Sequence, residues 1–164
     1  MLGKAVARHN AHREEAMEKM EIRVKKTDPM ATLPVYASGE AAGADLYACL
    51  KEKIVIGPGE TVMISTGIAM EIPKGYAGFV YGRSGTAVKR GLAPANKVGV
   101  IDSDYRGEIM VGIYNHGAAP AEILPNERIA QIVIAPVARC AFVSSEELED
   151  TRRGAGGFGS TGKL

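Results

Sequence analysis

Short apolar runs follow one another along most of the chain, and glycine or proline interrupts them at roughly ten-residue intervals. The run "KIVI" ends at "GPGE", "TVMISTGIAMEI" ends at "PKGY", and "AGFVYGR" ends at "SG"; the runs "EIMVGIYNHG" and "RIAQIVIAPV" follow. Near the start, Ile22 and Val24 alternate with polar residues, as in a half-buried strand. This pattern predicts many short β-strands between Met20 and Val143.

The same region offers little helix. Only "TAVKRG", from Thr86 to Gly91, has a helical pattern, and it is barely longer than one turn. Because no long helix alternates with the strands, the pattern argues against a parallel α/β sheet and favours an all-β sandwich or barrel. Residues 1–19 differ, since they are rich in helix formers and carry mixed charge; they predict a helical or disordered extension before the β domain.

Composition excludes several classes of function. The chain of 164 residues fits one domain, and its net charge of +1 gives no basic excess for nucleic acid or an anionic membrane. No apolar run approaches the roughly 18 residues of a membrane span, so a cytoplasmic location is expected. Cys49 and Cys140 stand in apolar settings that predict core positions, and His9, His12 and His116 lack the spacing of zinc ligands. The expected partner is a small molecule or another copy of the chain.

The stretch from Arg152 to Gly162 reads "RRGAGGFGSTG" and contains five glycines. Its glycine spacing fits a dinucleotide fingerprint and nearly fits a P-loop, but both motifs need a helix after the glycines, and little more than Leu164 follows. Composition alone leaves two interpretations, a flexible terminus or a nucleotide-binding flap. The second is favoured because arginine and hydroxyl groups suit phosphate, and Phe158 suits a flat base.

A flap of this kind needs a matching anion site in the β domain. The stretch "GRSGTAVKR" places Arg83, Ser84 and Gly85 before the helical turn, where N–H groups, a hydroxyl and a positive charge can face one anion. A simple turn with a helix cap explains this stretch equally well. Gln131 stands among apolar residues in "ERIAQIVI", where a buried amide needs partners that a ligand or water can provide.

Two carboxylates and one aromatic ring complete the candidate chemistry. Asp102 follows the apolar run "VGVI" directly, where partial desolvation would suit a base that takes a proton from water. Tyr105 is close enough along the chain to supply a flat wall, although "DSDYRG" by itself predicts an ordinary hairpin tip. Asp45, in "AGADLYA", lies on an expected strand of small residues, where a turn or edge carboxylate is the simpler interpretation.

Five stretches, in this order, closely resemble the five motifs of the trimeric deoxyuridine triphosphatase (dUTPase) family: "AGADLYA", "GRSGTA", "GVIDSDYRG", "ERIAQIVI" and "RRGAGGFGSTG". With the strands between them, the resemblance extends from Met20 to Lys163. Two departures occur, Gly82 where the family has alanine or proline, and Thr86 where it has leucine or methionine. Both bear on local packing rather than on the chemistry, and residues 1–19 have no counterpart in the family core.

The resemblance implies a jelly-roll-like β-barrel that forms a homotrimer. Residues 1–19 would be an extension, residues 20–143 the barrel core, and residues 144–164 a mobile glycine-rich arm that closes over the active site. Each active site would take a hairpin from one chain, a phosphate floor from a second and the arm from a third. The implied reaction is hydrolysis of dUTP to dUMP and pyrophosphate, which limits uracil in DNA and supplies dUMP for dTMP synthesis.

Residue roles are also implied by the resemblance. Asp102 would activate the water that attacks the α-phosphorus, with Gln131 as its catalytic partner, and Asp45 would reach Mg²⁺ only through the waters of the metal. The substrate-binding residues implied in this way are Arg83, Ser84, Gly85, Asn96, Val100, Asp102, Tyr105, Met110, Gln131, Arg153, Phe158, Gly159, Ser160 and Thr161.

Two rival functions remain open at this point. A dCTP deaminase shares the implied fold and triphosphate site but uses a glutamate to activate water at the base ring; the "IDSDY" stretch and the glycine-rich tail favour dUTPase instead. A non-catalytic trimeric nucleotide sensor or scaffold is the alternative from another class. Asp102 discriminates here, because a pure binder has no need of a carboxylate beside the α-phosphate.

Overall fold

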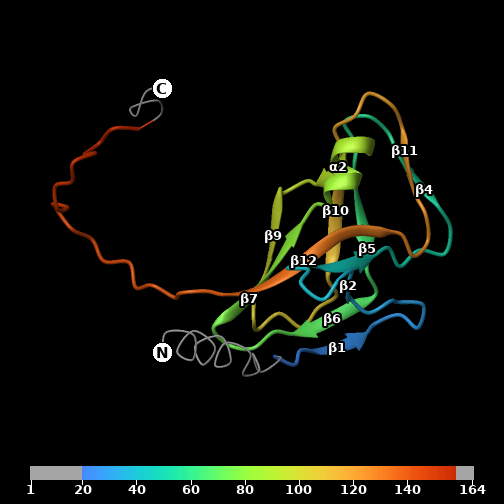
Figure 1. Ribbon diagram of the computed structural model, residues 1–164, viewed down its shortest axis with the longest axis horizontal. Helices are drawn as coiled ribbons and strands as arrows, with labels where there is room; N and C mark the ends of the chain where they lie inside the picture. The colour runs from blue at the N-terminus through green and yellow to red at the C-terminus, as the bar shows by residue number, and fades with distance from the viewer. Residues whose placement is uncertain (1–19, 158–164) are drawn as a thin grey trace, which may run out of the picture.

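The computed structural model describes residues 20–157, which form short β-strands and one short helix (Figure 1). The strands expected from the sequence are confirmed, with additional short strands between them. They are β1 (Arg23–Lys26), β2 (Val35–Tyr36), β3 (Ala44–Tyr47), β4 (Ile54–Ile56), β5 (Thr61–Ser65), β6 (Ile68–Glu71), β7 (Tyr76–Tyr81), β8 (Leu92–Pro94), β9 (Val98–Ile101), β10 (Met110–Asn115), β11 (Ala121–Ile123) and β12 (Arg128–Pro136).

The strands pair in eight antiparallel ladders, which form four sheets. The largest sheet has the order β2-β3-β12-β7-β9, and a second has the order β5-β10-β8; β1 pairs with β6, and β11 pairs with β4. The expected all-β, jelly-roll-like fold is confirmed, although the described strands do not close into one continuous barrel. The strands are short because turns interrupt the chain every few residues, and side chains from all four sheets contribute to one buried core.

The core is built largely from isoleucine. On β10, buried and less buried positions alternate, and Val111, Ile113 and Asn115 face inward. This is the period of two that a half-buried strand requires. The largest side chains that are fully buried are Leu46, Ile56, Ile64, Ile68, Ile72, Leu92, Ile109, Ile113, Ile123, Ile129, Ile132 and Asn115.

The one helix in the described part of the chain is α2 (Ser84–Arg90), which begins two residues before the expected helical stretch. It ends at Gly91, whose φ of 68° lies in the left-handed region that glycine adopts without strain. Lys89 and Arg90 occupy its last turn, where positive charge is favourable. Its first turn contains no acidic residue and no side-chain cap, so the N–H groups there have no side-chain partner.

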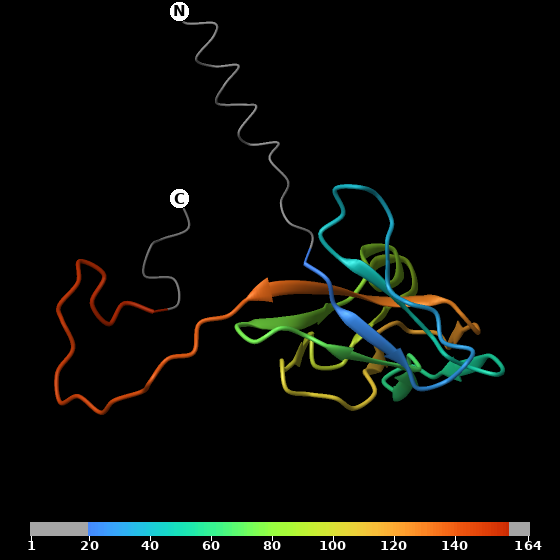
Figure 2. The same ribbon diagram turned by 90° about the horizontal axis from the view of Figure 1, so that it is seen from below.

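Residues 137–157 contain no helix or strand, and both views show this segment running away from the sheets (Figures 1 and 2). Phe142 is 98% exposed and Leu148 is 89% exposed. Cys140, expected in the core, is exposed, because it lies in this segment. Cys49 is half-buried; burial raises the pKa of its thiol, and the nearby carboxylates of Asp28 and Glu108 raise it further.

Within residues 20–157, no helix is both long enough and apolar enough to cross a membrane.

Asn115 provides a test of the packing. Its side chain is fully buried; the amide nitrogen donates to the carbonyls of Ile56 (2.8 Å) and Ala119 (2.9 Å), and the amide oxygen accepts from the Gly117 N–H. We expect Asn115→Ala to lower the free energy of unfolding by about 3 kcal/mol or more, because three backbone groups lose their partner. Urea denaturation at one fixed protein concentration measures this change.

Ser38→Ala, at an exposed position, is the control and should stay within about 0.5 kcal/mol of the wild type. Equal stability of the two variants would contradict the role given to the Asn115 amide.

Candidate active site

Three residues implied for substrate binding line one pocket. Asn96, Val100 and Met110 border a cavity of about 260 Å³ between β9 and β10. Two glycines keep it open: a Cβ on Gly99 would come within 3.2 Å of the Val80 Cβ, and a Cβ on Gly112 would come within 3.0 Å of the Met63 sulfur. The pocket is partly apolar, and backbone of β9 and β10 lies along it.

The strands around this pocket do not form the expected hairpin. β9 pairs with β7, in the register Gly78↔Ile101 to Tyr81↔Val98, whereas β10 pairs with β5 and β8. Among the described residues, no ladder joins β9 to β8 or to β10. β9 is therefore an edge strand, and its outer backbone groups are available to a ligand in the pocket.

Asp102 lies immediately after β9, at the start of the loop that leads to β10. In the single chain its side chain is exposed, so the expected partial desolvation is absent. Tyr105 is 45% exposed; its N–H donates to the Asp102 carbonyl (3.2 Å), and its hydroxyl donates to the Glu108 carbonyl (2.9 Å). Asp102 and Tyr105 thus belong to one hydrogen-bonded loop.

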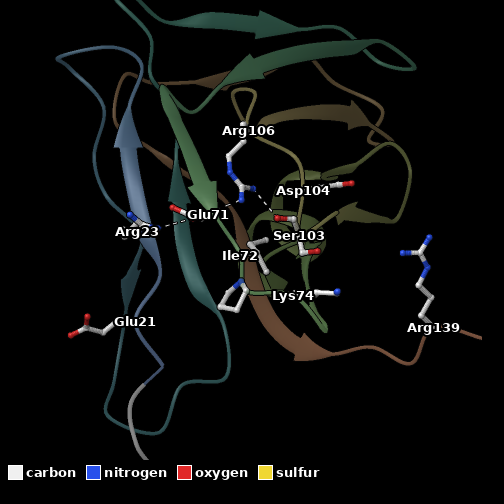
Figure 3. A pocket seen from close by; sticks show the side chains of 10 residues that line it. Glu21, Arg23, Glu71, Ile72, Lys74, Ser103, Asp104, Arg106 and Arg139 are labelled. Carbon is white, nitrogen blue, oxygen red and sulfur yellow. Dashed lines mark hydrogen bonds and ion pairs between the residues drawn. The ribbon is translucent and has the colours of Figure 1, made fainter.

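Arg106 ties this loop to the neighbouring strands (Figure 3). Its guanidinium donates to the carbonyls of Ser103 (2.7 Å) and Tyr105 (2.9 Å), and it lies 3.9 Å from the Glu71 carboxylate. Glu71 in turn pairs with Arg23 of β1 at 2.7 Å. These groups line a charged cleft of about 500 Å³ next to the loop. Sequence reasoning did not assign Arg106, because its hydrogen bonds are to backbone atoms.

A second cluster forms around Asp45 in the interior of β3. Asp45 is 5% exposed, and the structure places it between β2 and β12, so it is neither a turn nor an edge residue. The Nε of Arg83 donates to one of its carboxylate oxygens at 2.7 Å. Ser84 and Gly85 follow Arg83 as the exposed first turn of α2. The terminal nitrogens of Arg83 make no hydrogen bond to other described residues.

Gln131 faces Asp45 across the β3–β12 ladder and faces Tyr81 across the β12–β7 ladder. Its amide nitrogen donates to the Gly82 carbonyl at 2.9 Å. A backbone group is therefore one of the hydrogen-bond partners that a buried amide was expected to need. A Cβ on Gly43 would lie 2.7 Å from the Gln131 amide oxygen, so a side chain there would require the Gln131 amide to shift.

The two departures from the family pattern fit their surroundings. A Cβ on Gly82 would come within 3.2 Å of the Pro94 Cδ, a distance that tolerates alanine only if the proline moves slightly. Thr86 is buried on the inner side of α2. No buried side-chain oxygen or nitrogen lacks a hydrogen-bond partner in the described part of the chain.

Arg128 is a member of the Asp45 cluster that sequence reasoning missed. Its guanidinium contacts the second carboxylate oxygen of Asp45 at 3.3 Å. Arg128 and Gln131 are three residues apart, a spacing that places two side chains on opposite faces of a regular strand. A shift of register between Arg128 and Ala130 brings the two side chains to the same face of the sheet. No pattern in the sequence predicts this shift.

Asp45 fits Mg²⁺ in one way. Each of its oxygens already accepts an arginine N–H, and a carboxylate oxygen has two lone pairs, so each can accept one further hydrogen bond from a metal-bound water. Residues 20–157 contain no group of three or more acidic, histidine or cysteine side chains that would enclose an ion directly. Asp45 therefore suits a hydrated Mg²⁺ ion whose direct ligands come from another molecule.

The two clusters are not joined within one chain. No side-chain hydrogen bond or ion pair of the described residues connects the Asp45 cluster with Asn96, Asp102 or Tyr105. Arg153 lies in the extended segment, where its Nε donates to the Gly156 carbonyl at 2.9 Å. The other implied residues of the tail, Phe158, Gly159, Ser160 and Thr161, lie outside the described residues.

A partly apolar pocket on one edge of an all-β fold, together with a separate arginine cluster, suits a ligand with an apolar and an anionic part, as a nucleotide has. A sequence profile described as dUTPase matches residues 30–162. The chain therefore belongs to the dUTPase family.

Curated relatives agree with this assignment. The chain is 51% identical over 144 residues to a deoxyuridine 5'-triphosphate nucleotidohydrolase of Nautilia profundicola, a match covering 88% of this chain and 100% of the relative. It is 48% identical over 146 residues to the enzyme of the same name from Syntrophotalea carbinolica, covering 89% of this chain and 99% of the relative.

Solved structures of the family have the same fold. The dUTPase of Staphylococcus bacteriophage 80alpha with dUpNHpp superposes with a TM-score of 0.79 at 29% identity, covering 87% of this chain and 98% of that one. The dUTPase of phage phi11 of S. aureus gives a TM-score of 0.73 at 25% identity, covering 80% of this chain and 100% of that one.

Gly107 provides a test of the loop geometry. A Cβ there would lie 2.6 Å from the Cζ of the Tyr105 ring, so Gly107→Ala must displace that ring and break its hydrogen bond to the Glu108 carbonyl. Because Tyr105 is half-exposed, we expect a change of at most about 1 kcal/mol in the free energy of unfolding. Crystal structures of the variant and of Gly39→Ala, which meets nothing within 4 Å, check this. An unmoved Tyr105 would contradict the prediction.

Proposed function

We propose that this chain hydrolyses dUTP to dUMP and pyrophosphate, by attack of a water that Asp102 activates on the α-phosphorus. The reaction limits uracil in DNA and supplies dUMP for dTMP synthesis. One observation carries the proposal: β9 lines the pocket with Val100 and continues directly into Asp102. A base held in this pocket would have its sugar and α-phosphate directed along the same loop, toward the carboxylate.

Recognition of uracil follows from its hydrogen-bonding edge. Uracil presents an acceptor, a donor and an acceptor in sequence, and the open backbone edge of β9 and the Asn96 amide offer complementary groups. Cytosine would leave buried polar groups unpaired, which typically discriminates by 10⁴–10⁵-fold. The narrow pocket, with Val100 and Met110 on its walls, leaves little room for the methyl group of thymine.

Tyr105 provides the discrimination between deoxyribose and ribose. Its ring is held by the hydroxyl bond to the Glu108 carbonyl, and it occupies the space that a Cβ on residue 107 would need. A sugar packed against a ring fixed in this way has no space for a 2′-hydroxyl group. Gly107 therefore contributes to this selectivity indirectly, because the absence of a side chain leaves room for the Tyr105 ring.

The phosphate floor is assigned to Arg83, Ser84, Gly85 and Gln131. The free terminal nitrogens of Arg83 and the N–H groups of the first turn of α2 are donors that suit phosphate oxygens. Asp45 would hold Mg²⁺ only through the waters of the metal, and the ion, when bound with the triphosphate, would supply positive charge to the phosphate oxygens. Asp102 takes a proton from the attacking water as the new oxygen–phosphorus bond forms, and pyrophosphate leaves with the electrons of the bond that breaks. A positioned base contributes about 10²–10⁴-fold.

We also propose that three copies of the chain build each site. In one chain, Asp102 is exposed and separate from the Arg83 floor, and the segment after β12 exposes Phe142 and Leu148 almost completely. Such side chains are commonly covered by a partner. Residues 144–164 would form the arm, with Arg153, Ser160 and Thr161 on the phosphates and Phe158 with Gly159 over the uracil.

We assign residues 20–143 to the core of the proposed enzyme, a division supported by the position of the strands between Arg23 and Pro136, and residues 1–19 to an extension. Both cysteines are free thiols, which suits the reducing cytoplasm that we propose as its location.

Membership of the dUTPase family favours phosphate hydrolysis over the two rival functions. A deaminase would release ammonia from dCTP, whereas this chain should release pyrophosphate from dUTP. A non-catalytic binder should release neither.

Replacing Asp102 tests the assignment of the base. Asp102→Asn keeps the size of the side chain but removes the basic group, so kcat for dUTP should fall by about 10²–10⁴-fold. Affinity for the imido analogue dUpNHpp should stay within several-fold of the wild type. The matched control is Asp104→Asn, two residues further along the same loop, which should keep near-normal turnover. Near-normal turnover by Asp102→Asn would refute its role as the base.

Mixed trimers test whether the arm acts on another chain. A variant that lacks residues 151–164 should be folded but inactive, because the arm adds charge on the phosphates and excludes water. Asp102→Asn subunits are also inactive, yet mixtures of the two should regain activity where an intact arm covers an intact Asp102 of another copy. Pyrophosphate release after co-refolding measures this. Inactive mixtures, with mixed trimers verified by mass spectrometry, would show that the arm does not act in trans.

A further inference from the structure

Arg128 and Gln131 lie on the same face of the large sheet, although they are three residues apart. Arg128 faces Tyr47 across the β3–β12 ladder, and Gln131 faces Asp45. Tyr47 and Asp45 are two residues apart and therefore share a face, and residues directly opposite in an antiparallel ladder also share a face. The extra residue of a bulge, between Arg128 and Ala130, is what allows this arrangement.

The bulge thereby completes a clamp around a buried carboxylate. Asp45 accepts from the Nε of Arg83 at 2.7 Å on one oxygen and from the guanidinium of Arg128 at 3.3 Å on the other. The Asp45 side chain is 7% exposed, whereas those of Arg83 and Arg128 are 26% and 49% exposed. The carboxylate is thus held from both sides, while each arginine keeps part of its guanidinium accessible.

We propose that Arg128 is a positioning residue for the phosphate floor, acting through Asp45; this rests on the proposed function. Without Arg128, one oxygen of the carboxylate is released, and the carboxylate plane is no longer fixed. The Nε of Arg83 then loses a fixed acceptor, so the terminal nitrogens that face the triphosphate lose their orientation. Misplacement of a binding group by about 1 Å lowers a rate by as much as 10²-fold.

Arginine is suited to this task in a way that lysine is not. Its planar fork contacts Asp45 with one terminal nitrogen while the rest of the group remains accessible, and its charge is permanent. An alternative is that Arg128 merely adds positive charge near the triphosphate. The two roles differ in one respect: an effect through Asp45 must disappear when the Asp45 carboxylate is removed.

A double-mutant cycle tests this difference. Arg128→Gln should raise the dissociation constant for dUpNHpp about tenfold, measured with and without Mg²⁺, and lower kcat/KM by about 10–100-fold. In an Asp45→Asn background, the same substitution should change either quantity by less than about threefold, since contacting residues are not additive. Lys53→Gln, which breaks the exposed pair with Glu122 in another sheet, is the control and should resemble the wild type.

An equal effect of Arg128→Gln in both backgrounds would assign Arg128 to the nucleotide directly and overturn the proposal, as would no effect in the wild-type background. If Arg128→Gln does not fold, as judged by thermal unfolding and trimer formation, Arg128→Lys takes its place in the same cycle. A wild-type chain that does not hydrolyse dUTP would reject the proposed function instead, because analogue binding by the cycle variants is measured independently of turnover.

Discussion

The pairing of β12 with β3 on one side and with β7 on the other is the constraint on which the proposed phosphate floor depends. Asp45 lies on β3, Gln131 on β12, and Arg83 two residues after β7, so only this strand order brings them together. The buried carboxylate of Asp45 makes the arrangement specific, because an uncompensated charge in this position would be strongly destabilising. Two arginines from different segments, Arg83 and Arg128, compensate this charge.

The pocket depends on the opposite feature, a place where strands do not pair. β9 and β10 follow each other in sequence but belong to different sheets, and the space between them is the cavity with Asn96, Val100 and Met110 on its walls. A ladder here would have closed the site with its own hydrogen bonds. Because the strands diverge, backbone donors and acceptors of β9 remain available to the proposed base, while hydrogen bonds of Arg106 and Tyr105 stabilise the connecting loop.

Local patterns predict the strands well and their partners poorly. The alternation of β10 and the glycine that ends α2 depend on near neighbours, and these features could be predicted from the sequence. The bulge before Ala130 and the divergence of β9 from β10 depend on contacts between distant segments, so Arg128 and the open pocket could not be predicted. Cys140 shows the same limit, since its apolar neighbours indicated a core that the chain does not form around it.

Exposure connects these observations with assembly. Asp102 directly follows an apolar strand, yet it is exposed, and the apolar side chains of Phe142 and Leu148 are exposed as well. A base near a phosphorus atom works best where water is excluded, and apolar side chains are stabilised by burial. Both requirements are met together if other copies of the chain cover the loop and the segment after β12. Folding stability and activity would then be linked to the same association, so both would depend on protein concentration.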